Sequence, residues 1–249
     1  VDGADDDEVT MRANREAFER IEFVPRALVD VADRNLATTV LGTPLALPII
    51  LGPTGTPAFQ HPDAELAATR AAHTHGTVLT ASTAGSYAVG EIAAASSGPL
   101  WFQLYHSRDE GLTNHLIDSA IDARCTALIV TVDCPVGGPR ERDLRNGWTA
   151  PPRLTQSNLV DALIHPDRLA RWAWRFRRGP GVELANIASY GGHTSTGWIT
   201  ALFDDRQTWE RVAVIRDRWH GPLAIKGITT AADARRAAEI GVDGIVVSN

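Results

Sequence analysis

The sequence lacks a hydrophobic run long enough to cross a bilayer. Apolar stretches such as Leu45–Leu51 and Ala127–Val132 are short enough to be buried strands, whereas a spanning helix needs roughly 20 residues. An excess of positive charge is also absent, because 24 Lys and Arg face 30 Asp and Glu, a formal net charge of −6. This balance argues against nucleic-acid binding. With 44% hydrophobic and 22% charged residues, the chain is expected to be globular rather than disordered, collagen-like or coiled-coil.

Cysteine is scarce, and the ends of the sequence lack processing signals. Cys125 and Cys134 are the only two cysteines and form no CxxC motif, which excludes a disulfide framework and a zinc site. We therefore expect buried thiols, no metal, and a reducing, cytoplasmic setting. The sequence has no initiating Met and no signal peptide, and it stops at Val247-Ser248-Asn249, directly after an apolar run. These ends lead us to expect a fragment, truncated on both sides.

Short apolar runs alternate with helical patterns, which predicts βα units and a parallel sheet. The expected strands are 47–51, 77–80, 100–105, 127–132, 223–226 and 244–248. The expected helices are 63–75, 89–95, 110–124, 209–219 and 231–240. A doubly wound sheet is the alternative, but its usual GxGxxG after the first strand is missing. We predict a TIM (β/α)8 barrel, incomplete here because only about six of its eight units are present.

The predicted organisation is a single domain over 1–249 with two additions to the barrel pattern. Residues 1–46 form a helical lead-in, with a helix over 10–21. Residues 150–207 form an insert after the fourth strand, rich in Trp, Arg, Gly and Pro, which we expect to be a lid or binding loop and the least ordered part of the chain. Within it, 168–178 alternates aromatics with five arginines. A solvated amphipathic helix is the first interpretation, and a peripheral membrane contact is the alternative.

Every predicted strand ends in hydrogen-bonding groups, at the positions where a TIM barrel carries its functional residues. Any one of them could be an ordinary helix cap or turn residue, but the set is more specific. Lys226 directly follows an apolar strand and should project into the barrel mouth, where an anionic or electron-rich ligand would be its partner. The candidates are Pro53, Thr54, Gly55, Ser82, Gln103, Tyr105, Thr131, Asp133, Lys226 and Ser248.

Six stretches give the chain a close resemblance to the FMN-dependent α-hydroxy acid dehydrogenases and oxidases, such as L-lactate dehydrogenase, glycolate oxidase and mandelate dehydrogenase. They cover nearly the whole chain outside the insert. They are DGADDDEVTMRANREAF (2–18), LPIILGPTG (47–55), WFQLY (101–105), TVDCPVGGPRERDLRNG (131–147), LAIKGITTAADAR (223–235) and GVDGIVVSN (241–249).

The resemblance implies FMN as cofactor and assigns a role to each strand end. The residues implied to hold the flavin and its ribityl chain are Pro53, Thr54, Gly55, Ser82, Gln103, Thr131, Lys226 and Ser248. Lys226 would stabilise the negative charge of the reduced ring. Tyr105 would bond the substrate near its hydroxyl, and Arg140 would bind its carboxylate bidentately. Asp133 would orient and charge a catalytic His. The implied catalytic residues are thus Tyr105, Asp133 and Lys226.

The implied reaction is oxidation of an L-2-hydroxy acid to the 2-oxo acid. The small Ala84 favours lactate-like or bulkier acids over glycolate. The implied partners are an electron acceptor (quinone, cytochrome or oxygen) and further copies in a homo-oligomer. The family's catalytic His-Gly-Gly-Arg run would follow Asn249, and none of the eight histidines present replaces that His; His106 is expected to be a loop residue. The alternative for this chain is a truncated, non-catalytic barrel fragment that serves as a binding or partner module. Another FMN barrel, such as an isomerase, is disfavoured by the Arg140 motif.

Overall fold

The computed structural model describes residues 4–138, 140–146, 164–167, 170, 173–174, 177, 179–180, 184–191 and 204–248. The chain divides into two compact units, one of Val1–Asn35 and Gly137–Pro166, the other of Leu36–Val136 and Asp167–Asn249. Most of the predicted insert, including the helix expected around 168–178, lies outside the described residues. No helix of the described part is long and apolar enough to span a membrane.

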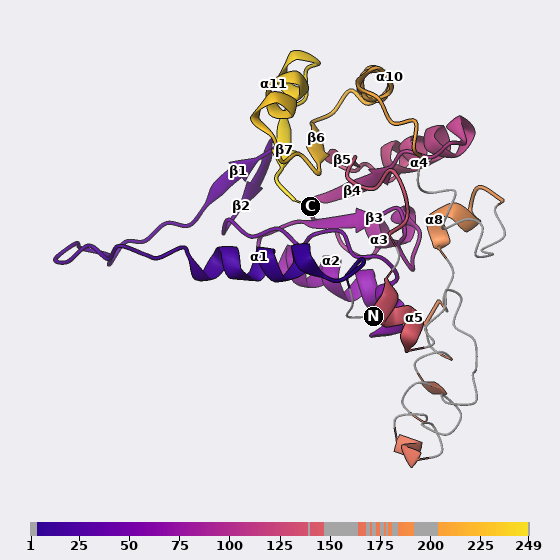
Figure 1. Cartoon of the computed structure of the whole chain (residues 1–249), viewed down its shortest axis with the longest axis horizontal. Helices are drawn as coiled ribbons and strands as arrows, with labels where there is room; N and C mark the ends of the chain where they lie inside the picture. Colours follow the sequence, from indigo (N-terminus) through magenta and orange to yellow (C-terminus); the bar gives the residue numbers. More distant parts are fainter. Residues whose placement is uncertain are drawn as a thin grey trace. The chain divides into compact units, whose positions relative to one another are not determined.

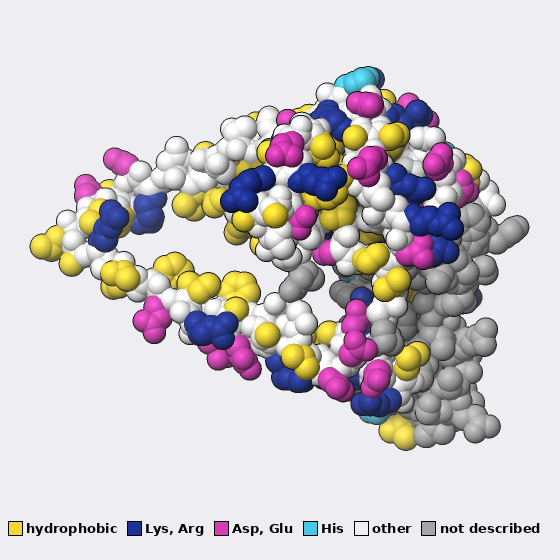
Figure 2. All heavy atoms as spheres, turned by 45° about the horizontal axis from the view of Figure 1, so that its top comes forward, with side chains coloured by type: hydrophobic (Ala, Val, Ile, Leu, Met, Phe, Trp, Pro, Cys, Tyr) yellow, Lys and Arg dark blue, Asp and Glu magenta, His cyan; other side chains and the backbone are white. Residues whose placement is uncertain are grey.

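The first unit contains two described helices. They are α1 (Val9–Glu19) and α5 (Glu141–Arg145). In the segment between α1 and Asn35, the side chains of Phe23, Val24 and Leu28 are at least 90% exposed. Figure 2 shows hydrophobic and charged side chains side by side along this segment. These three side chains therefore bury almost no surface against the described part of the chain.

The second unit is built around five parallel strands in sequential order, β3-β4-β5-β6-β7 (Figure 1). The strands are β3 (Leu79–Ser82), β4 (Leu100–Tyr105), β5 (Ala127–Thr131), β6 (Leu223–Lys226) and β7 (Gly244–Val246). The helices that follow them are α3 (Val89–Ala94), α4 (Glu110–Asp122), α8 (Ala185–Ala188), α10 (Trp209–Arg218) and α11 (Ala231–Glu239). Helix α2 (Ala64–Thr74) precedes β3. Each predicted strand–helix pair from 77 onward is confirmed.

The first predicted strand, 47–51, was wrong. Only Leu51 makes a strand contact, an isolated parallel bridge to Leu79. Pro48 lies in this stretch, and proline cannot donate to a strand ladder. A hairpin of β1 (Thr38–Val40) and β2 (Thr43–Leu45), which the periodicity did not predict, precedes it.

Alternation along the strands separates the sheet into two buried faces, because successive side chains point to opposite sides. One face, which we call the inner face, carries Trp101, Ala127, Ile129 and Ala224, packed together with Leu45 of the hairpin. Trp101 Nε1 donates to Thr43 Oγ1 at 3.0 Å, so the hairpin caps the amino ends of the strands. The outer face packs against the helices through residues such as Phe102, Leu104, Leu128, Val130 and Leu223.

The helices start and stop where local chemistry requires. Asp109 caps α4 by accepting hydrogen bonds from the backbone N–H groups of Gly111 and Leu112. Thr230 caps α11 in the same way through Asp233 N. Gly76 follows α2 with φ +63°, a conformation that L side chains rarely adopt, and an added Cβ would lie 2.8 Å from Ala46 Cβ. Gly76 therefore suits the end of this helix, where a left-handed residue is needed.

Candidate active site

Five predicted site residues lie on the inner face at the carboxyl ends of neighbouring strands. The strand register pairs Ser82 with Gln103, Tyr105 with Thr131, and Thr131 with Lys226. Gln103 and Tyr105 are two residues apart on β4 and so share this face. The register thus confirms the spatial clustering that strand ends alone had suggested.

A buried chain of hydrogen bonds links three of these strand ends. Ser82 Oγ donates to Gln103 Oε1 at 3.1 Å, and Gln103 Nε2 donates to Thr131 Oγ1 at 3.0 Å. Ser82 Oγ also accepts from the backbone N–H of Ala84. All three side chains are buried. Because a satisfied buried network fixes its members in one arrangement, these groups present a rigid polar surface.

An ion pair lies beside this chain of hydrogen bonds. Lys226 Nζ lies 3.4 Å from Asp133 Oδ2, and both side chains are partly buried. The next residue, Gly227, has φ +106°, and an added Cβ would lie 2.6 Å from Asp133 Cβ. Only glycine therefore lets the β6 end approach Asp133 this closely.

The segment Pro53-Thr54-Gly55 reaches the same edge from the preceding loop. Thr56 N donates to Ala84 O at 2.8 Å, and a Cβ added to Gly55 would meet Ala84 Cβ at 3.6 Å, an ordinary contact. Thr54 and Gly55 are exposed and Pro53 is half-buried. Gly55 and Ala84 are therefore neighbours at the end of β3.

Two further candidates behave differently. Ser248 lies two residues after Val246, which pairs with Lys226, and its Oγ is buried with no hydrogen-bond partner among the described residues. Arg140 belongs to the first unit, where it is 55% exposed and its Nε lies 3.8 Å from Asp5 Oδ1. Its place in the substrate site stays a prediction.

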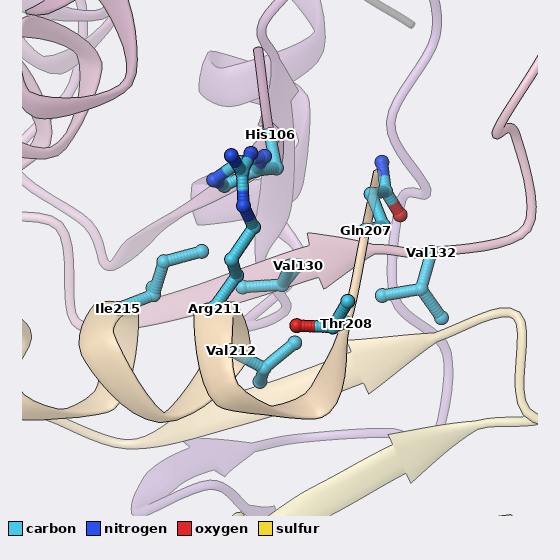
Figure 3. A pocket seen from close by; sticks show the side chains of 8 residues that line it. All are labelled: His106, Val130, Val132, Gln207, Thr208, Arg211, Val212 and Ile215. Carbon is cyan, nitrogen blue, oxygen red and sulfur yellow. The ribbon is translucent and has the colours of Figure 1, made fainter. Parts of the chain in front are cut away.

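His106 is buried, whereas the sequence led us to expect an ordinary loop residue. It follows β4 and belongs to the even-numbered set that faces the helices, so it points away from the inner face. It lines a small cavity with Val130, Val132 and Arg211, between β5 and α10 (Figure 3). Burial and the nearby Arg211 lower the pKa of His106, against the opposing effect of Asp204.

Asp204 is the centre of this buried cluster. It is fully buried, accepts from Arg211 Nη1 at 2.5 Å, and its Oδ2 lies 3.2 Å from His106 Nδ1. That histidine nitrogen nevertheless has no partner at hydrogen-bonding geometry in the described part. The cluster therefore joins the end of β4 to α10 and stands behind the inner face, not in it. No group of three or more His, Cys, Asp or Glu in the described ranges could hold a metal.

A sheet of parallel strands in sequential order, with helices outside and polar groups at the carboxyl ends, is the architecture of a TIM-barrel enzyme. A family model described as FMN-dependent dehydrogenase matches residues 1–249. The chain belongs to the FMN-dependent dehydrogenase family. Its fold is the TIM (β/α)8 barrel, incomplete in this chain, and its cofactor is FMN, as expected from the sequence.

Solved structures agree with this membership. The monotopic membrane protein (S)-mandelate dehydrogenase is 34% identical with a TM-score of 0.90, covering 100% of this chain and 66% of its own. A mandelate oxidase bound to 3,3-difluoro-2-hydroxy-3-phenylpropionic acid is 35% identical with a TM-score of 0.77, covering 99% and 61%. A Pediococcus acidilactici lactate oxidase is 32% identical with a TM-score of 0.78, covering 100% and 60%. This chain thus spans somewhat less than two thirds of these relatives.

The strand ends fit a flavin. The unpartnered, buried Oγ of Ser248 is a group that a bound ligand would satisfy. Lys226, on the same face, supplies a cation at the edge of a hydrogen-bonding surface made by Gln103 and Thr131. Polar donors and a fixed positive charge are what the ring edge of FMN requires.

Proposed function

We propose that the whole protein oxidises an L-2-hydroxy acid of lactate-like size or larger to the 2-oxo acid, with FMN held at the strand ends. The observation that carries this proposal is the Lys226–Asp133 pair, 3.4 Å apart, on the edge that also carries the Ser82–Gln103–Thr131 chain. A cation fixed by a carboxylate beside a rigid donor surface suits a ring that gains negative charge.

Bound FMN supplies a two-electron acceptor. The substrate loses its hydroxyl proton and its carbon-bound hydrogen with two electrons, so that the carbon–oxygen single bond becomes a carbonyl. Tyr105 holds the substrate near its hydroxyl, and Arg140 binds the carboxylate. Asp133 orients and charges the catalytic base, which by resemblance is a His beyond Asn249. Lys226 would lie at the edge of the bound ring, next to Asp133.

The substrate range follows from the end of β3. Ala84 is small, adjoins Gly55, and packs with Tyr105 against the same apolar cluster. A small side chain there leaves space for a methyl or a larger group on the acid. The relatives named above support this range, since they are mandelate and lactate enzymes.

Anaerobic mixing of the whole, FMN-loaded protein with L-lactate and with (S)-mandelate tests the proposal. We expect the yellow flavin absorbance to be lost with at least one acid and retained with glycolate or the D-isomers. Bound FMN that no 2-hydroxy acid reduces would favour the non-catalytic binding module. A protein that stays colourless when FMN is supplied would contradict the flavin site itself.

The partners and location remain part of the proposal. We propose an electron acceptor that is a quinone, a cytochrome or oxygen, a homo-oligomer, and a cytoplasmic location with a peripheral membrane contact. Trp174, in the arginine-rich stretch, is 51% exposed, and the matched mandelate dehydrogenase is a monotopic membrane protein. Cosedimentation with anionic vesicles should fall for Trp174→Ser and be unaffected by Ile121→Ser, an exposed apolar residue on α4.

A further inference from the structure

We propose that Asn186 is a positioning residue that fixes the carboxyl ends of β3 and β4 and thereby sets Ser82, Ala84 and Tyr105 in place for the substrate. It belongs to α8, in the part of the insert that the structure describes. The inference rests on the proposed function for its kinetic consequence, but its structural basis is independent of it.

Both polar atoms of the Asn186 side-chain amide bind one loop, which lies about a hundred residues earlier in the chain. Its Nδ2 donates to the backbone carbonyl of Ser82 at 3.0 Å, and its Oδ1 accepts from Val89 N at 2.8 Å. The side chain is only 2% exposed. Ala185 N adds a bond to Gly85 O at 3.1 Å. Since an unpaired buried amide is costly, this side chain keeps both ends of the 82–89 loop at a fixed separation.

The apolar side of α8 reaches the substrate residues directly. Leu184 and Ile187 are buried and form a cluster against which Ala84 and Tyr105 pack. Tyr105 is also tied to the loop, because its backbone N–H donates to Thr83 Oγ1 at 3.1 Å. Movement of α8 would therefore be transmitted both to the residue proposed to set substrate size and to the residue proposed to bond the substrate.

The far side of the loop has its own anchor, on α2. Glu65 on α2 accepts from Ser86 N at 2.6 Å, and Tyr87 OH donates to Pro62 O at 2.9 Å. Burial raises the pKa of Glu65. The loop is thus held between α2 and α8, and the α8 side is the one whose apolar cluster includes Ala84 and Tyr105.

Two variants separate positioning from general stability. Asn186→Asp keeps the shape and the acceptor for Val89 N, but it sets a carboxylate oxygen in place of the donor to Ser82 O and Thr83 O. The matched control is Ser189→Ala, at the C-terminal end of the same helix. Its hydroxyl donates to the backbone carbonyl of Asn186 and lies 2.9 Å from His115 Nε2. Both would be made in the whole, FMN-loaded protein.

The first measurement is amide hydrogen exchange, which needs no catalysis. We expect Asn186→Asp to speed exchange at residues 82–89 and at Tyr105 by at least about fivefold to tenfold, the factor that corresponds to one lost hydrogen bond. Ser189→Ala should leave these amides unchanged. Equal exchange in the two variants would overturn the inference, whether or not the protein oxidises hydroxy acids.

The second measurement is kinetic. Asn186→Asp should raise KM for the 2-hydroxy acid about fivefold to tenfold with FMN still bound, and this effect should be non-additive with Tyr105→Phe. If Asn186→Asp leaves KM unchanged but lowers Tm, Asn186 has only a structural role and the inference is wrong. If the unmodified protein reduces no flavin, the proposed function fails and the exchange result alone decides the role of Asn186.

Discussion

Replacing Gly227 by alanine tests how the Lys226–Asp133 pair is built. The new Cβ would lie 2.6 Å from Asp133 Cβ, 2.7 Å from its Cγ and 2.9 Å from its backbone nitrogen. Because backbone and Cβ atoms are involved, rotation of the carboxylate cannot relieve the overlap. The backbone conformation at φ +106° adds a penalty of about 1–2 kcal/mol for an L residue, and forced overpacking costs a further 1–3 kcal/mol or so.

We therefore expect Gly227→Ala to lower the free energy of unfolding by about 2–5 kcal/mol, measured by urea denaturation. Gly241→Ala is the matched control, because Gly241 has φ +78° but nothing within 4 Å of an added Cβ. It should cost only the conformational part, about 1–2 kcal/mol. FMN binding should weaken in the first variant only, since Asp133 must move away from Lys226. Equal destabilisation by the two alanines would refute the close packing of Gly227 against Asp133.

Periodicity predicted β4, β5 and β6 well because those strands are buried on both faces. Leu100–Tyr105, Ala127–Thr131 and Leu223–Lys226 are mainly apolar and buried along almost their whole length, a pattern typical of parallel strands. The 47–51 stretch has the same composition but contains Pro48. Its missing backbone donor limits the ladder to one bridge at Leu51, a constraint that composition alone does not show.

The strand-end residues of the site could be predicted because the barrel architecture fixes where they meet. The supporting residues could not. Asn186 lies in a segment whose Trp, Arg, Gly and Pro content suggested an irregular insert, and its only local signal is the three-residue spacing of Leu184 and Ile187, which marks one helical face. Asp204 and His106 pair across 98 positions of sequence, and no local pattern reveals a contact of that range.

Three further predictions test a buried thiol, a buried histidine and the substrate arginine. Burial raises the pKa of Cys125 to about 12. A thiol reagent at about pH 8 should therefore modify the half-exposed Cys134 in the folded protein but reach Cys125 only after unfolding. Rapid labelling of both thiols in the folded protein would contradict the burial of Cys125. In the folded protein the pKa of His106 lies below its ordinary 6.5, so the unfolded chain protonates this imidazole more readily. The contribution of His106 to the free energy of unfolding is therefore present above about pH 6.5 and is lost as the pH falls below that value. His106→Gln should therefore flatten the decline in unfolding free energy between about pH 7 and pH 5, and an unchanged slope would show that the decline has another source. Arg140→Lys in the whole protein should raise KM for L-lactate roughly tenfold to a hundredfold with flavin retained, because lysine keeps the charge but loses one of two charge-assisted hydrogen bonds, each contributing about 1.5–3 kcal/mol. Arg145→Lys, whose partner is Glu141 one helical turn away, should change KM little; equal effects of the two substitutions, or loss of flavin from the first, would mean that a different arginine binds the carboxylate.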